Sequence, residues 1–472
     1  MKRIILIAAL CALFHACRMP VAPPAPYGPV PTTAQLEWQK MEYYMFVHFG
    51  PNTFTDMEWG DGREDPQVFR PIALDCRQWA ETAVNAGMKG IIITAKHHDG
   101  FCLWPSRYST HTVRESGWRE GRGDVLRELS DACRTAGLKF GVYLSPWDRN
   151  HPTYGTPDYN EVFTAMLAEV LTGYGAVFEQ WFDGANGEGD NGKRQVYDWP
   201  LFHRTVYHYQ PSAVIFSDVG PGCRWIGNED GRAGETNWSR LDTTGFEPGK
   251  IPVLDTLTIG NIYGQAWIPA ETDVSIRPGW FYSPATDDKV KPTDELRAIY
   301  YTSVGRNSNL LLNVPPDRNG RIHPHDSTRL MDFRAAIEAD FRHNLAAGAT
   351  ITANNIRGDS PRYSAVHLLD ADFDTYWATD DTATTATLEI TLPAPQTFSR
   401  LLLQEYIPLG QRIAAVDVDY WDDTSHTWMS LASATTIGYK RILQFPATTS
   451  DKLRIHIRRS LACPTLSTVG VY

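Results

Sequence analysis

One apolar stretch of the chain ends on a single carboxylate and then turns sharply. Residues 176–182 read Ala-Val-Phe-Glu-Gln-Trp-Phe, and Asp183 follows them before a glycine-rich segment that runs to Gly189. A buried strand that carries a carboxylate at its C-terminal end is how barrel enzymes present a catalytic acid or nucleophile. Asp183 is therefore the first catalytic candidate, although Asp before Gly is also ordinary turn chemistry.

Polar and aromatic side chains stand at the ends of other apolar runs. His48 ends one run, His97 and His98 end the next, and Tyr143 and Trp181 lie near the ends of two more. In a barrel these strand ends converge on one face, so we expect the five side chains to share a pocket with the carboxylate. Aromatic residues make up 12% of the chain, which suits a carbohydrate enzyme because sugars stack on aromatic rings. We therefore interpret the histidines as donors to sugar hydroxyls.

Zinc is the alternative ligand for the three histidines. No HxH or HExxH pattern accompanies them, whereas zinc sites usually combine three or four donors at fixed geometry. A lone histidine is more often a core residue with its hydrogen bonds satisfied, but His-His-Asp directly after a strand is poorly explained by packing alone. No metal and no cofactor are therefore predicted.

A glycosidase needs a second carboxyl group, which retaining enzymes hold about 5–5.5 Å from the first. The glycine-rich loop 217–238 contains Glu229 and Glu235, and loop carboxylates are usually solvated acids. Trp225 lies just upstream of Glu229, and a nearby apolar wall raises the pKa of a carboxyl group enough to keep it protonated as a general acid. Glu229 is thus the expected acid/base residue, with Glu235 as the second choice.

The segments between these residues alternate between apolar runs of strand length and stretches of helical period, which predicts a parallel α/β fold. The expected strands are 43–49, 89–95, 138–145, 176–183, 213–218, 265–271 and 309–314, and the expected helices are 76–86, 123–136, 159–173, 197–209, 293–303 and 326–343. About seven β/α units fit a TIM-like barrel, in a regular or an irregular form.

Beyond residue 345 the pattern changes to short strands with a period of two, which predicts an antiparallel β-sandwich. Its clearest strands are 387–392, 399–404, 416–421 and 452–457. Asp370, Asp372 and Asp374 could bind Ca²⁺ or only cap a turn, and we predict no metal there. The sandwich either binds glycan or braces the barrel, and fold analogy does not choose between these roles.

The N-terminal sequence predicts that the protein is exported. Residues 4–14 form an apolar run behind Lys2 and Arg3, and the run is too short to span a bilayer. Ala16 and Cys17 resemble a lipoprotein cleavage site, and the proline-rich segment 18–34 is expected to be an extended spacer. We therefore expect attachment through a lipid on Cys17, in the periplasm or at the outer membrane of a bacterium.

The amino-acid composition indicates which classes of partner the protein binds. The formal net charge of −11 argues against nucleic acid, which is bound through basic surfaces, whereas the 15 Trp and 21 Tyr residues suit a carbohydrate enzyme because sugars stack on aromatic rings. The cysteines beyond the leader form no CxxC pair and are expected to be buried free thiols: Cys76, Cys102, Cys133, Cys223 and Cys463.

Together, the motifs resemble those of family 29 glycoside hydrolases, the retaining α-L-fucosidases. The matching segments follow one another in the family's order within residues 35–343: 45–50, 58–60, 96–101, 141–145, 181–184, 309–314 and 316–321. The resemblance implies that Asp183 is the nucleophile and that 224–229 is similar to the acid/base segment of the subgroup that prefers α-1,3- or α-1,4-linked fucose. The implied substrate-binding residues are His48, Trp59, His97, His98, Tyr143, Trp181, Trp225 and Trp280.

The whole chain is therefore expected to divide into four parts, and the start of the sandwich, 351–354 with 369–378, resembles a discoidin-like carbohydrate-binding module. An export signal (1–17) and a spacer (18–34) precede a catalytic barrel (35–345) and a discoidin-like sandwich (346–472). The implied enzyme is an exo-α-L-fucosidase that releases fucose from α-1,3/1,4-fucosylated oligosaccharides or glycoconjugates. The alternatives are a fucosidase that favours α-1,2 or aryl fucosides and an inactive glycan-binding surface protein, which the retained carboxylates disfavour.

Overall fold

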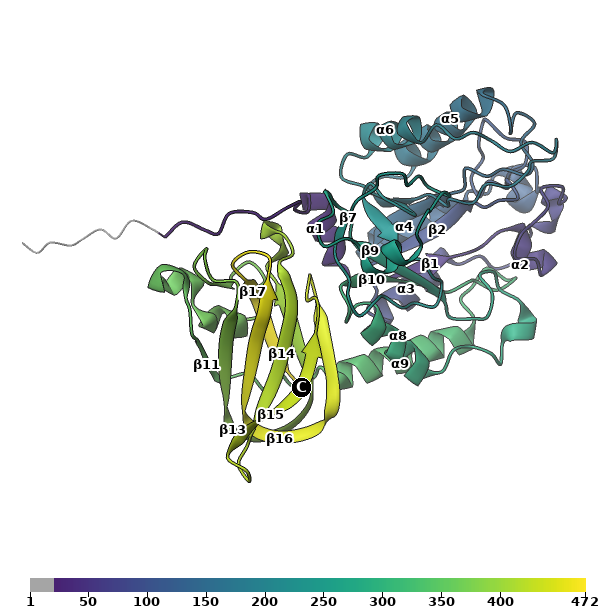
Figure 1. Cartoon of the computed structure of the whole chain (residues 1–472). Coiled ribbons are helices and arrows are strands. Elements are labelled where there is room, and N and C mark those ends of the chain that lie inside the picture. The colour runs from purple at the N-terminus through teal and green to yellow at the C-terminus, as the bar shows by residue number, and fades with distance from the viewer. Residues whose placement is uncertain (1–20) are drawn as a thin grey trace, which may run out of the picture.

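A computed structural model describes residues 21–472, so the expected export signal and the lipidation site Cys17 lie outside the described residues. Two domains lie side by side, a barrel surrounded by helices and a sandwich of long strands (Figure 1). The predicted α/β barrel followed by an antiparallel β-sandwich is confirmed. No helix in residues 21–472 is both long enough and apolar enough to cross a bilayer.

Eight parallel strands close the barrel in the order β1-β10-β9-β6-β5-β4-β3-β2. They are Tyr43–Val47 (β1), Gly90–Lys96 (β2), Lys139–Leu144 (β3), Val177–Trp181 (β4), Val214–Ser217 (β5), Cys223–Trp225 (β6), Ala270–Ser275 (β9) and Ser308–Asn313 (β10). The strands are buried along almost their whole length, as expected of a parallel sheet covered on the outside by helices and filled inside by side chains.

The barrel is irregular between β5 and β6. The two strands pair in parallel, with Phe216 opposite Cys223, and no helix separates them. The prediction missed β6 because three residues give no apolar run, and it placed the next strand too early. Ala266–Trp267 (β8) instead pairs with Arg240–Leu241 (β7) outside the barrel, and β9 begins at Ala270.

Helices cover the outside of the barrel, and all six expected helices are present. The helices are Thr33–Gln39 (α1), Pro51–Thr55 (α2), Cys76–Asn85 (α3), Val125–Ala136 (α4), Asp158–Gly173 (α5), Trp199–Tyr209 (α6), Asp255–Ile259 (α7), Thr293–Thr302 (α8) and Pro324–Asp340 (α9). Helix α4 shows why such boundaries are readable: Asp124 caps its first turn by accepting the Arg127 N–H, and Gly137 ends it in the left-handed conformation.

The sandwich follows the barrel and has its own apolar core. Its strands are Thr350–Ala353 (β11), Trp377–Ala378 (β12), Ala386–Glu405 (β13), Ile413–Asp422 (β14), Thr427–Ala434 (β15), Arg441–Ser460 (β16) and Thr465–Val471 (β17), all paired antiparallel. The carboxylates of Asp370 and Asp372 accept the N–H groups of Asp372 and Asp374, which is the geometry of a capped turn.

The proline-rich segment lies against the sandwich. Residues 21–27 contain no helix or strand. Arg357 donates to the Ala22 carbonyl at 2.7 Å, and Arg412 donates to the Ala25 carbonyl at the same distance. This part of the expected spacer is therefore extended, and it is bound to the sandwich. All five cysteines of the described residues are free and buried, as predicted.

Candidate active site

The three histidines stand at adjacent strand ends. His48 directly follows β1, and His97 and His98 directly follow β2. Nδ1 of His48 lies 2.8 Å from Oδ1 of Asn313, the last residue of β10, and Nδ1 of His98 lies 2.8 Å from the Ser145 hydroxyl. Burial lowers the pKa of His48 to about 3 and that of His98 to about 4. The rings are thus neutral near pH 7, and a neutral imidazole can donate one hydrogen bond and accept another.

Aromatic rings join these histidines into one cluster. Tyr143 stacks on Trp181 with 5.2 Å between ring centroids, and Trp280 lies 5.1 Å from the His48 ring. Trp59 is 5.8 Å from the His98 ring and is 56% exposed, so it forms the outer edge of the cluster. The structure therefore brings the expected substrate-binding side chains together: His48, Trp59, His97, His98, Tyr143, Trp181 and Trp280.

Asp183 lies two residues beyond β4, next to this cluster. Its Oδ1 accepts the Ala185 N–H at 2.8 Å, and its Oδ2 accepts the Tyr143 hydroxyl at 3.1 Å. Nε2 of His98 is 3.6 Å from the same Oδ2. The side chain keeps 28% of its exposure, so the carboxylate is both oriented by the protein and open to a substrate. The Asp-Gly turn is present, and it aims the carboxylate into the site.

Glu229 lies in the loop that follows β6 and lines the same cavity as Asp183. The Trp280 indole N–H donates to its Oε2 at 3.3 Å. Burial raises the pKa of Glu229, the Trp280 hydrogen bond opposes this shift, and the negative charge of Asp183 adds to it. Trp225 does not bond to Glu229; its indole N–H donates to Asp273 Oδ1 at 2.9 Å.

A cavity of about 1330 Å³ contains both expected catalytic carboxyl groups. Asp183 and Glu229 line it together with Trp181, Trp225 and Asp273. Ligand pockets commonly measure about 300–1,000 Å³, so this cavity has room for more than one sugar ring beside the carboxylates. A partly exposed carboxylate that shares a cavity with a carboxyl group of raised pKa is the pairing that a two-step glycosidase uses.

Glu235, the second choice for the acid/base role, lies elsewhere. Its carboxylate is paired with Arg306 and with Arg441 of the sandwich. The side chain is 66% exposed at the junction of the two domains. It is not among the residues that line the cavity with Asp183.

Comparison with known proteins identifies the family. The sequence model of the α-L-fucosidase family matches residues 28–336, and that of the F5/8 type C domain matches residues 350–465. The chain belongs to the α-L-fucosidase family. It is 42% identical to alpha-L-fucosidase 1 of Arabidopsis thaliana over 452 residues, which cover 95% of this chain and 88% of the relative.

Solved structures agree over both domains. A family 29 fucosidase from Ruminococcus gnavus, solved in complex with fucose, has a TM-score of 0.88 and 34% identity over 96% of this chain and 97% of its own. A glycoside hydrolase family 29 member from an unknown rumen bacterium has a TM-score of 0.83 and 43% identity over 95% of this chain and 78% of its own. The enzyme is thus an α-L-fucosidase with a discoidin-type C-terminal domain.

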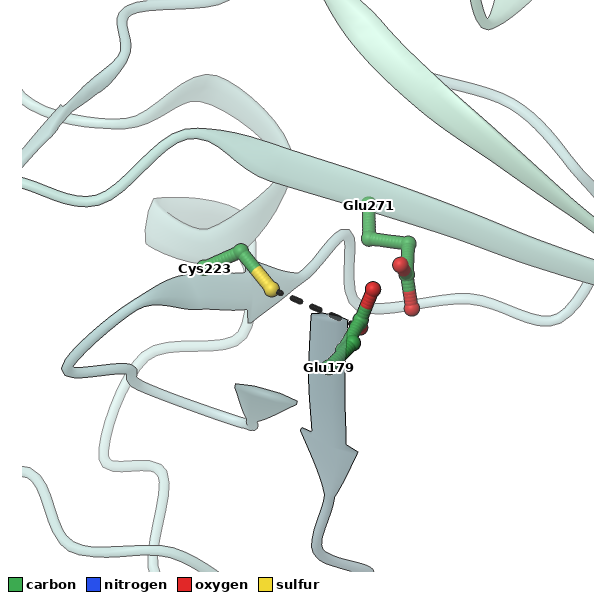
Figure 2. Close-up of side chains that lie close together, drawn as sticks. All are labelled: Glu179, Cys223 and Glu271. Atoms are coloured by element: carbon green, nitrogen blue, oxygen red, sulfur yellow. Dashed lines mark hydrogen bonds between the residues drawn. The ribbon is translucent and has the colours of Figure 1, made fainter. Parts of the chain in front are cut away.

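Sequence reasoning missed a buried carboxyl pair beneath the active site of this fucosidase. Glu179 on β4 and Glu271 on β9 point toward one another inside the barrel, with the Cys223 thiol beside them (Figure 2). Burial raises the pKa of Glu179 to about 7 and that of Glu271 well above its usual range. At least one of the two therefore holds a proton at neutral pH.

The same cluster is poorly suited to a metal. A protein donor already occupies each carboxyl oxygen: Trp38 and Cys223 donate to Glu179, and Tyr44 and Trp181 donate to Glu271. A cation would have to displace these N–H and O–H groups. We assign the pair to the hydrogen-bond network that holds the Trp181 indole, whose N–H lies 2.9 Å from Glu271 Oε1.

Asp273 is the other residue that the prediction missed. It lies on β9, the strand that the prediction placed too early, and its side chain lines the cavity together with Glu229. Burial raises its pKa well above the usual range, and the negative charge of Glu229 adds to this effect. A neutral Asp273 can both accept the Trp225 N–H and donate its own proton.

Proposed function

We propose that this enzyme is a retaining exo-α-L-fucosidase in which Asp183 is the nucleophile and Glu229 is the acid/base residue. The carboxylate of Asp183 attacks the anomeric carbon of fucose and forms an ester, while Glu229 transfers its proton to the departing oxygen. In the second step the Glu229 carboxylate takes a proton from water, which displaces Asp183. The observation that carries this proposal is that both groups line one cavity, where burial and the negative charge of Asp183 raise the pKa of Glu229.

The neutral histidines at the ends of β1 and β2 and the aromatic rings around them support a role of this cluster in binding fucose. Imidazoles of His48, His97 and His98 pair with sugar hydroxyls, and the Trp280 ring offers a surface to an apolar face of the sugar. None of these interactions requires a metal. Activity that survives exhaustive chelation agrees with this assignment, whereas loss of activity with loss of stoichiometric zinc contradicts it.

For the substrate, we propose fucose linked α-1,3 or α-1,4 to a branched glycan. The support is the large cavity that continues beyond Asp183 and Glu229, because a branched leaving group needs space on that side of the scissile bond. The loop 224–229 also resembles the acid/base segment of the subgroup with this preference. Lewis-type trisaccharides compared with 2'-fucosylated lactose test the linkage directly. We expect a kcat/KM at least about tenfold higher for the Lewis-type substrates, and equal or faster cleavage of the fucosylated lactose contradicts the proposal.

The residue roles have a separate test. Glu229→Ala removes the general acid, so cleavage of natural glycans should fall by several orders of magnitude, while activated aryl fucosides still enter the first step. Azide, which needs no general base, should then restore turnover and give a fucosyl azide with the α configuration of the substrate. Glu235→Ala is the matched control and should show no rescue. Rescue in the Glu235 variant alone would reverse the assignment.

A further inference from the structure

The loop that carries Glu229 is fixed at its far end by the sandwich. This acid/base loop, residues 226–239, begins on the barrel, where the Ile226 N–H donates to the Glu271 carbonyl at 3.0 Å. It ends against two sandwich side chains. The Asn237 N–H donates to the Thr436 hydroxyl at 3.0 Å, and the Ser239 N–H donates to Gln411 Oε1 at 2.7 Å. Both domains therefore determine the path of this loop.

Arg441, the first residue of β16, makes the charged contact between the sandwich and the acid/base loop. Its guanidinium donates to the Glu235 carbonyl at 2.7 Å and to the Glu235 carboxylate at 2.7 Å. The arginine side chain is only 5% exposed, and Arg306 of the barrel binds the other carboxylate oxygen of Glu235. Charge-assisted bonds to two groups of one residue fix both its backbone and its side chain.

The acid/base loop contains no helix or strand. Gly227 and Gly231 adopt positive φ angles of 91° and 71°, where an added side chain would be strained. Inside the loop, the Asn228 side chain bonds to the Arg232 carbonyl. The barrel holds the segment between Glu229 and Glu235 through Ala233, whose N–H donates to the Thr302 carbonyl at 2.8 Å. Arg306, which binds the Glu235 carboxylate, also donates to the Ala233 carbonyl at 3.1 Å. The contact between Arg441 and Glu235 is therefore connected through Arg306 to the backbone of the segment that carries Glu229.

We propose that Arg441 is a positioning residue that acts through Glu235 on Glu229, so that the sandwich sets the geometry of the acid/base group. This inference rests on the proposed role of Glu229. A shift of about 1 Å in a catalytic group can cost about a hundredfold in rate. Displacement of the loop should therefore impair proton transfer to the leaving group and leave the attack by Asp183 unimpaired.

The test is the leaving-group dependence of Arg441→Ala, measured as kcat/KM for aryl fucosides that range from good to poor leaving groups. We expect a loss of about tenfold or more for the poor leaving groups and of less than about threefold for the activated ones. Arg441→Lys should recover part of the loss. The exposed Glu235→Gln variant, which keeps the fold but weakens the same contact, should show a smaller loss of the same kind.

Arg400→Ala is the matched control, because Arg400 also joins the sandwich to the barrel. It binds Asp340 at 2.8 Å and the Tyr301 hydroxyl at 2.6 Å, and neither residue belongs to the acid/base loop. The control should lower thermal stability without changing the leaving-group dependence. The positioning role would be overturned if Arg441→Ala and Glu235→Gln lowered kcat/KM equally for all leaving groups. It would also be overturned if Arg400→Ala showed the same leaving-group dependence as Arg441→Ala.

Glu229→Ala in the same assay separates the two proposals. If Glu229→Ala shows a strong leaving-group dependence and the Arg441 and Glu235 variants do not, the positioning inference fails and the catalytic assignment stands. If Glu229→Ala itself shows no such dependence, the assigned acid/base residue is wrong.

Discussion

Opposing interactions control the acidity of Glu229. Burial and the neighbouring negative charge of Asp183 favour its neutral form, whereas the Trp280 N–H stabilises the carboxylate. A residue that must donate a proton in one step and accept it in the next is served by such a balance, because each of its two forms has a favourable interaction. The indole is therefore a means of tuning the enzyme's pH range.

Replacement of Trp280 by phenylalanine should move the alkaline limb of the kcat/KM profile to higher pH. On this limb kcat/KM falls as Glu229 loses its proton. Loss of the indole N–H raises the pKa of Glu229 further, so the fall occurs at higher pH. The shift is to higher pH because the indole N–H stabilises only the charged form of Glu229. Trp225→Phe is the control, since that indole bonds to Asp273. A limb that stays in place or moves down in Trp280→Phe would contradict this account.

The residues that the sequence revealed are those that follow a recognisable strand. Asp183, His48 and the His97-His98 pair stand at the ends of clear apolar runs, and the closed barrel brings such ends together. Asp273 escaped notice because its strand was placed several residues early. The position of Glu235 was unreadable because a glycine-rich loop has no periodicity and its partner Arg441 is 206 residues away.

Strand β4 connects the active site to the interior of the barrel. Successive side chains of a strand point to opposite faces, so Glu179 and Trp181 share the inner face. The Trp181 indole stacks on Phe216 at 3.9 Å and donates to Glu271, the partner of Glu179. A protonated carboxyl pair thus supports one wall of the pocket.

The buried pair should make stability depend on pH. Both folded-state pKa values are raised above the usual 4.5. The stabilisation of the folded protein by the protonated pair is therefore complete below about pH 4.5, and it is lost as the pH rises toward the folded-state pKa values. Glu271→Gln removes one titrating group and can still accept the Trp181 N–H. Relative to this variant, the wild type should lose up to about 1.4 kcal/mol of unfolding free energy per pH unit between pH 5 and 7. Chemical denaturation at several pH values measures the difference, and a difference that is constant with pH would contradict the prediction.

Secondary structure was predictable wherever length and periodicity were sufficient. Helices such as α4 have an apolar face, an aspartate cap and a terminal glycine, which are all local signals. Strand β6 has only three residues, and its Arg224 is fully buried because the guanidinium donates to the Leu257 and Ile268 carbonyls. Those partners are distant in sequence, so no local pattern could predict a buried arginine in a barrel strand.

At the scale of the whole molecule, the sandwich is joined to the barrel by polar contacts. Asn307 of the barrel bonds to the backbone of Tyr439 and Lys440, and Arg400 bonds to Asp340. These contacts support the bracing role that the sequence left open beside glycan binding. The domain boundary was predictable from the change of period. The docking of the domains depends on long-range polar contacts and on an apolar cluster of Tyr301, Leu402 and Ile442, which composition does not reveal.

Membrane attachment remains a proposal that rests on residues 1–17. If Cys17 carries a lipid, the full-length chain produced in a lipoprotein-exporting bacterium should be recovered with the membrane fraction. A Cys17→Ser variant should be recovered in the soluble fraction with the same activity on an aryl fucoside. Identical fractionation of the two chains would argue against lipidation.

The central claim is that Asp183 forms the covalent intermediate, and trapping tests it most directly. A fluorinated fucoside with a good leaving group should trap the enzyme, because fluorine beside the anomeric carbon slows both steps, while the good leaving group keeps formation of the fucosyl ester faster than its release. Proteolysis and mass spectrometry of the trapped enzyme should then locate one fucosyl group on the peptide that contains Asp183, and Asp183→Asn should remain unlabelled. Label on any other carboxylate would contradict the account.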